Sequence, residues 1–93
     1  MTLKKHGKFL LDFVVRYADG EMDRWEFDLD YSGYMIEHFG PFEVETPKLA
    51  VKFARTVDSA YSNYSWMQND SFRLAISDAV DEFLGTSQIS DIY

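Results

Sequence analysis

Two segments near the start of the chain alternate between large apolar and mostly polar side chains. Every second position is apolar in residues 9–17 and again in residues 23–31. The apolar sets are Phe9, Leu11, Phe13, Val15 and Tyr17 in the first segment and Trp25, Phe27, Leu29 and Tyr31 in the second. A period of two is typical of a strand with one buried face, so both segments are predicted to be β-strands. Leu10 and Val14 fit less well, because they fall on the otherwise polar face of the first strand.

The two predicted strands are joined by the short segment Ala18-Asp19-Gly20. A three-residue loop with Gly20 in a left-handed conformation pairs Phe13 with Trp25, and it gathers the large apolar side chains on one face. A two-residue loop would pair Phe13 with Glu26 instead, and a slip of one residue moves every side chain to the other face. The sequence therefore predicts an antiparallel hairpin with the three-residue loop.

The opposite face of this hairpin would be acidic. Asp12 would lie across from Glu26, and Glu26, Asp28 and Asp30 would follow one another along the second strand. Side chains two apart on a strand recur at about 6.6 to 6.8 Å, which is about twice the charge spacing of ~3.4 Å along one strand of DNA. The predicted hairpin thus carries a regular row of carboxylates, called the acidic ladder below.

Residues 31–39 are ambiguous. Their apolar spacing and the following Gly40-Pro41 favour a short helix, whereas the alternation from Tyr34 to Phe39 would also fit a third strand. Residues 42–45 alternate again and could form a brief strand.

Two helices are predicted in the second half of the chain. Thr46-Pro47 is typical of a helix start, and apolar residues continue at helical spacing to about Asn63. Asn69 or Asp70 would cap a second helix that ends at Gly85, leaving the last eight residues as a loose tail or a short edge segment. The predicted fold is a single α+β domain over residues 1–93, with a hairpin of two or three strands covered on one face by the two C-terminal helices.

Negative charge is concentrated in one part of the chain. The net charge is −7, and ten of the sixteen acidic residues lie between Asp12 and Glu45, where only Arg16 and Arg24 oppose them. Such a field attracts basic surfaces and repels nucleic acid and anionic membranes. The absence of cysteine suits a reducing cytoplasm, and we read no export signal and no apolar run long enough to cross a bilayer.

Two surfaces are candidates for binding a protein partner. The first is the acidic segment, with Asp12, Asp19, Glu21, Asp23, Glu26, Asp28 and Asp30; its alternative interpretation is a solvated face that keeps the protein soluble. The second is residues 61–69, where Tyr64, Trp66 and Met67 stand among small polar residues, as is typical of binding surfaces. Its alternative is that the aromatic side chains complete the core.

No catalytic, metal or cofactor site is predicted. An Asp12–Glu26 pair across the strands would be unspecific as an acid pair. His6 and His38 lie far apart in the sequence without further ligand spacing, and His6 is expected to be a mobile terminal residue. The acidic turn at residues 19–23 lacks the spacing of a calcium loop.

The function expected is therefore non-enzymatic: an inhibitor or modulator that occupies the basic site of a nucleic-acid-handling protein. In size, acidity, lack of cysteine and aromatic content the chain is similar to small phage and prophage proteins that block host defence, such as anti-CRISPR and anti-restriction DNA mimics. The resemblance covers general character only and carries over no residues. The alternatives are a structural accessory protein that self-associates, for instance as a homodimer, and a ligand-sequestering module with a pocket lined by Tyr34, Trp25 or Trp66.

Overall fold

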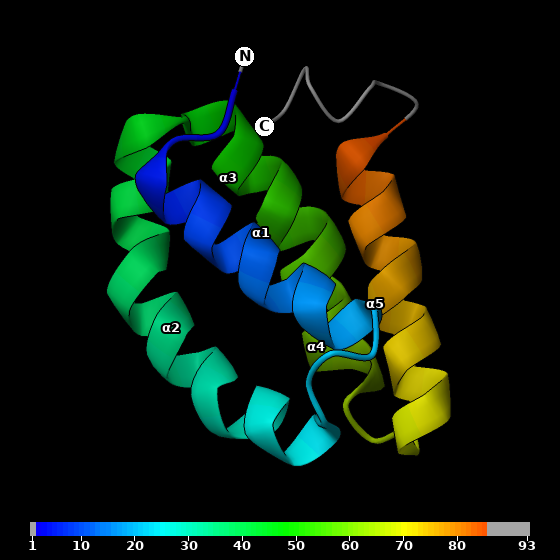
Figure 1. The fold of residues 1–93 in the computed structure, drawn as a ribbon. Helices are drawn as coiled ribbons and strands as arrows, with labels where there is room; N and C mark the ends of the chain where they lie inside the picture. The colour runs from blue at the N-terminus through cyan, green and yellow to red at the C-terminus, as the bar shows by residue number, and fades with distance from the viewer. Residues whose placement is uncertain (1, 86–93) are drawn as a thin grey trace.

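The computed structural model describes residues 2–85, and every regular element in this range is helical. The elements are α1 (Lys5–Ala18), α2 (Arg24–Glu45), α3 (Pro47–Phe53), the π-helical η1 (Ala54–Asp58), α4 (Ser59–Tyr64) and α5 (Asn69–Leu84). α3, η1 and α4 follow one another without a break and form one rod, called the α3–α4 rod. α2 and α5 lie on either side, and α1 crosses between them over the rod (Figure 1). The predicted α+β fold is wrong: residues 2–85 form a helical bundle.

Residues 9–17 are part of α1, so the first predicted strand is wrong. The buried residues of this helix are Gly7, Leu10, Leu11, Phe13, Val14 and Tyr17, which recur at steps of three and four. That is the spacing of one helix face. Leu10 and Val14, which fitted the strand poorly, are buried on this face, whereas Phe9 is 37 % exposed. Because the segment is apolar at nearly every position, it matches both periods, and burial against the other helices decides between them.

The second predicted strand and the segments after it all belong to α2. Phe27 and Tyr31, four residues apart, are buried, whereas Trp25 and Leu29 from the same predicted strand face are exposed. The Asp23 side chain accepts a hydrogen bond from the Glu26 backbone N–H at 2.8 Å and caps the helix.

Residues 31–39 are helical, as favoured from the sequence. The helix end predicted at Gly40-Pro41 and the brief strand predicted at residues 42–45 are both wrong. α2 continues through Pro41 to Glu45. A proline inside a helix leaves one carbonyl without its backbone donor, yet here the helix runs for a further turn, with Phe42 fully buried.

The two C-terminal helices are confirmed, but the side-chain cap predicted at Asn69 or Asp70 is wrong, because Gln68 is the N-cap residue of α5 and forms no side-chain cap. Pro47 begins the α3–α4 rod, which ends at Tyr64, and α5 ends at Leu84 before Gly85, whose φ of 69° lies in the left-handed region. The π-helical turn was not predicted. Within it the Thr56 hydroxyl donates to the Lys52 carbonyl oxygen at 2.8 Å. The tail expected over the last eight residues lies outside the described residues.

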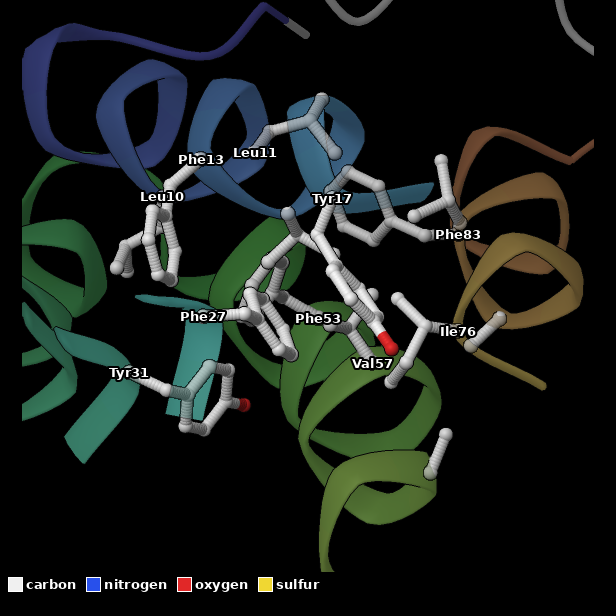
Figure 2. Close-up of a cluster of buried hydrophobic side chains, with 14 of the residues drawn as sticks. Leu10, Leu11, Phe13, Tyr17, Phe27, Tyr31, Phe53, Val57, Ile76 and Phe83 are labelled. Atoms are coloured by element: carbon white, nitrogen blue, oxygen red, sulfur yellow. The ribbon is translucent and has the colours of Figure 1, made fainter. Parts of the chain in front are cut away.

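The core is built mainly from aromatic side chains on facing helices. The rings of Tyr17 and Phe27 are stacked with centroids 4.2 Å apart, and Phe27 also stacks on Phe13 at 5.1 Å. Figure 2 shows Tyr17, Phe27 and Phe53 converging between α1, α2 and the α3–α4 rod. At the other end of α1, a Cβ added to Gly7 would come within 2.7 Å of Leu3 and 2.8 Å of Phe42. A larger residue at this position would force the Leu3 and Phe42 side chains to shift.

Candidate functional site

The fold brings the two candidate surfaces together at one end of the bundle. Arg24, at the start of α2, donates hydrogen bonds to the Ser65 and Met67 carbonyl oxygens at 2.6 and 3.0 Å, in the turn between α4 and α5. Its guanidinium also lies 4.0 Å from the centroid of the Phe72 ring. The start of α2 and the α4–α5 turn therefore share the lower end of the molecule in Figure 1. We call this surface the acidic-aromatic end; its residues are Asp19, Glu21, Asp23, Trp25, Glu26, Tyr64, Trp66 and Met67.

Both tryptophans of the chain lie on this end and face solvent. Trp25 is 74 % exposed and Trp66 is 77 % exposed. The Trp66 ring N–H donates to the Asn63 carbonyl oxygen at 2.8 Å, which holds the indole against the end of α4. Trp66 does not complete the core, as its alternative interpretation supposed, whereas Tyr61 does pack inward. Exposed tryptophans are unusual on a small monomer and are enriched where proteins bind one another.

The carboxylates of this end divide into structural and free groups. Asp23 caps α2, and Asp28 accepts a hydrogen bond from Arg24 at 2.9 Å in an ion pair. Asp19, Glu21 and Glu26 are exposed and form no ion pair within residues 2–85. These three carboxylates lie at the same end of the bundle as the two tryptophans, where Arg24 and Arg73 are the nearby cations, and they can attract a cationic group.

The acidic ladder does not exist. Successive residues of an α-helix are rotated by about 100°, so Glu26 and Asp30, four residues apart, lie on one side of α2, whereas Asp28 points to the other side. The strand register that placed Asp12 across from Glu26 is wrong as well, since Asp12 lies on the exposed face of α1. The carboxylates form an irregular cluster around a helix start, without the regular spacing of nucleic-acid phosphates.

Buried tyrosines fix the helices that carry this surface. The Tyr31 hydroxyl donates to Asp58 Oδ1 at 2.8 Å, and the rings of Tyr31 and Tyr61 stack with centroids 3.8 Å apart. Tyr61 in turn donates to Asp28 Oδ1 at 3.3 Å. Burial, followed by the charge of Asp58, raises the pKa of Tyr31, and burial followed by Asp28 raises that of Tyr61. Both hydroxyls therefore stay neutral and act as hydrogen-bond donors that join α2 to the rod.

A shallow groove of about 450 Å³ lies between the α3–α4 rod and α5. Arg55, Asp78 and Glu82 line it together with small side chains, and Tyr64 and Met67 of the acidic-aromatic end line it as well. Neither tryptophan nor Tyr34 lines this groove. The ligand pocket expected to be lined by those residues lay between the helices and a hairpin, and residues 2–85 contain no hairpin.

The two histidines are distant in the sequence but close in space. His6 is also held by a hydrogen bond, so the prediction that it is a mobile terminal residue is wrong. The Nδ1 atoms of His6 and His38 are 2.8 Å from one another, and the backbone N–H of His6 donates to Glu45 Oε1 at 3.0 Å. No sequence signal links two histidines that are 32 positions apart. Within the part of the chain that the structure describes, no group of three or more His, Cys, Asp or Glu side chains is placed to hold a metal ion.

Sequence reasoning missed one feature of α2. Leu29, Ile36 and Val44 are 63, 86 and 84 % exposed, so α2 carries large apolar side chains on its outer as well as its inner face. The signal was available in their helical spacing, but alternation assigned Leu29 to the core. Between residues 2 and 85 no helix is long and apolar enough to cross a membrane. Comparisons with protein-family models, curated proteins and solved structures found no match to this chain.

Proposed function

We propose that this chain is a non-enzymatic protein-binding module whose acidic-aromatic end occupies a basic site on a partner protein. The observation that supports the proposal is a pair of exposed tryptophans at the end of the bundle that also carries Asp19, Glu21 and Glu26, which form no ion pair within residues 2–85. An indole face attracts the cationic group of arginine or lysine. A carboxylate beside it forms charge-assisted hydrogen bonds with the same group.

The partner class we propose is a nucleic-acid-handling protein, which the module inhibits or modulates in the cytoplasm. Sites that hold nucleic acid present clustered lysine and arginine side chains toward phosphates, and such a site complements this surface. Since the acidic ladder is absent, the module acts by covering the basic site and not by copying the charge spacing of DNA. Electrostatic complementarity of this kind mainly raises the association rate and selects the partner.

The anchoring of the surface supports the same proposal. Arg24 ties the α4–α5 turn to α2 through two carbonyl oxygens, and Asp28 holds the Arg24 guanidinium in place. Both tryptophans are thus presented from a fixed backbone, and a preorganised surface loses less conformational entropy on binding.

The test is affinity capture from a bacterial lysate with three baits. The first is the unchanged chain, the second carries Asp19→Lys, Glu21→Lys and Glu26→Lys, and the control carries Asp78→Lys, Asp81→Lys and Glu82→Lys on α5. All six positions are exposed, so both variants fold and change the net charge equally. At low salt we expect the unchanged chain and the α5 control to retain nucleic-acid-binding proteins, and the other variant to lose them. Added duplex DNA should release the retained proteins from both baits. Equal capture by all three baits would exclude the proposed surface.

A further inference from the structure

The outer face of α2 carries an apolar stripe that nothing in the described chain covers. We call it the outer α2 stripe; its residues are Trp25, Leu29, Gly33, Ile36, Gly40 and Val44. The steps between them are three or four residues, which places them on one side of a helix. The four large side chains are each more than 60 % exposed. A stripe of this kind is normally covered by another surface.

The two glycines of the stripe have no role within the bundle. A Cβ added to Gly33 or to Gly40 would meet no atom within 4 Å, in contrast to Gly7. Glycine weakens a helix relative to alanine, so these positions cost helix stability without improving any contact in the single chain. They do leave the backbone open to close approach from outside.

The stripe is complementary to itself. In an antiparallel pair of α2 helices centred on the midpoint of Arg24–Glu45, Leu29 lies opposite Gly40 of the second copy, and Ile36 lies opposite Gly33 of the second copy. In each case a large side chain faces the space left by a glycine. Trp25 lies opposite Val44 of the second copy at both ends. The large and small positions of one copy therefore fit those of the other.

Charge also favours the antiparallel arrangement. The first turn of α1 lies against the end of α2, as the His6–Glu45 hydrogen bond of 3.0 Å shows. This end carries Lys4, Lys5, Lys8 and Lys48 together with Glu37, Glu43 and Glu45, so its charges nearly cancel, whereas the other end of α2 carries the acidic residues 19–26. Antiparallel helices place the nearly neutral end of one copy beside the acidic end of the other. A parallel pair would place the two acidic ends together.

We propose that two copies of this chain form a weak, reversible dimer through the outer α2 stripe. Trp25 and Val44 are about 28 Å apart along the helix, which is about 10 Å wide. The helix pair alone therefore buries about 280 Å² on each copy, well below the ~800 Å² of a standard interface. The net charge of −7 on each copy opposes association, so added salt strengthens this dimer. The dimer does not depend on the function proposed above, but it covers Trp25 and therefore competes with a partner that binds this residue at the acidic-aromatic end.

The test is sedimentation equilibrium over a range of protein concentrations at low and high salt. We expect a monomer–dimer equilibrium that Ile36→Asp weakens at least tenfold, because it places a charge opposite Gly33 of the second copy. Leu74→Asp is the matched control, since Leu74 is 67 % exposed on α5, outside the stripe; it leaves the equilibrium unchanged. A chain that stays monomeric up to about 1 mM, or a dimer that Ile36→Asp does not weaken, would overturn the proposal.

Cross-linking tests the orientation, since the natural chain has no cysteine. In the antiparallel dimer the double variant Leu29→Cys with Gly40→Cys places position 29 of each copy opposite position 40 of the other, and we expect it to form a covalent dimer under mild oxidation more efficiently than either single variant. The single variant Leu29→Cys would cross-link efficiently only in a parallel pair. Faster dimer formation by the single variant would overturn the antiparallel arrangement.

Discussion

The inner and outer faces of α2 differ in how their large side chains are used. On the inner face, Phe27 touches the rings of Tyr17, Phe13 and Phe72, and it is fully buried. On the outer face, Trp25 and Ile36 are at least 74 % exposed. Residues of the same apolar type therefore stabilise the fold on one side of the helix and remain available for binding on the other. Hydrophobicity alone does not distinguish the two roles; the position around the helix does.

The largest expected difference between the faces is in folding stability. Phe27→Ala removes a buried ring from the centre of the core, and we expect it to lower the free energy of unfolding by about 3 to 5 kcal/mol. Trp25→Ala removes a larger side chain from the exposed face and should change it by no more than about 0.5 kcal/mol. Denaturant unfolding of dilute protein measures both. A similar loss in the two variants would mean that Trp25 is part of the core.

The glycines provide a second contrast between packed and open positions. Gly7→Ala pushes a methyl group against Leu3 and Phe42, and we expect it to destabilise the fold by about 1 to 3 kcal/mol. Gly33→Ala meets open space and should stabilise the monomer by about 0.5 to 1 kcal/mol through helix propensity. Unfolding midpoints at low protein concentration give both values. If both substitutions changed the free energy of unfolding in the same direction, the packed surroundings of Gly7 and the open surroundings of Gly33 would be contradicted.

Tyr31 tests the hydrogen bond that joins the inner face of α2 to the rod. Tyr31→Phe removes the donor to Asp58, and we expect a loss of about 1 to 2 kcal/mol at neutral pH. Because the pKa of Tyr31 is raised in the fold, the unfolded chain releases its proton near pH 10 while the folded chain retains it. Stability therefore falls as the pH rises above about 10. This decrease should be smaller in Tyr31→Phe; an equal slope in both proteins would show that Tyr31 ionises freely.

The smallest expected effect concerns the charge around the exposed tryptophans. Fluorescence quenching by caesium ions should exceed quenching by iodide, relative to free tryptophan, because the carboxylates attract the cation and repel the anion. Asp19→Lys, Glu21→Lys and Glu26→Lys together should reverse this order. If the unchanged protein shows no preference between the two quenchers, the tryptophans are not surrounded by free negative charge.

The helices of the C-terminal half could be predicted from the sequence, whereas those of the N-terminal half were predicted as strands. Thr46-Pro47 and Gly85 mark helix ends through fixed backbone preferences that do not depend on the rest of the fold. Residues 9–17 are apolar at so many positions that periods of 2 and 3.6 both fit, whereas residues 23–31 alternate strictly and yet form a helix in which only Phe27 and Tyr31 of the four apolar residues are buried. There, the partner surface decides which period is realised. Leu10 and Val14 were the local sign of a helix, since they are four residues apart and did not fit the polar face of a strand.

The candidate site was predicted in part. The acidic segment and the Tyr64–Met67 segment were recognised from composition, but their proximity depends on Arg24, whose partners are 41 and 43 residues away in the sequence. The acidic ladder was wrong because side-chain direction depends on the element type. The pairing of His6 with His38 and the open surroundings of Gly33 and Gly40 are properties of the tertiary structure that no local pattern contains.

The most direct test of the proposed function is a titration of tryptophan fluorescence with an arginine-rich peptide at low salt. Both tryptophans lie on the acidic-aromatic end, so their emission reports binding there. We predict a saturable blue shift in the unchanged chain and in the Asp78→Lys, Asp81→Lys, Glu82→Lys variant, and at least tenfold weaker binding in the Asp19→Lys, Glu21→Lys, Glu26→Lys variant. Equal affinity of the peptide for the two variants would contradict the account, because net charge alone would then explain the attraction.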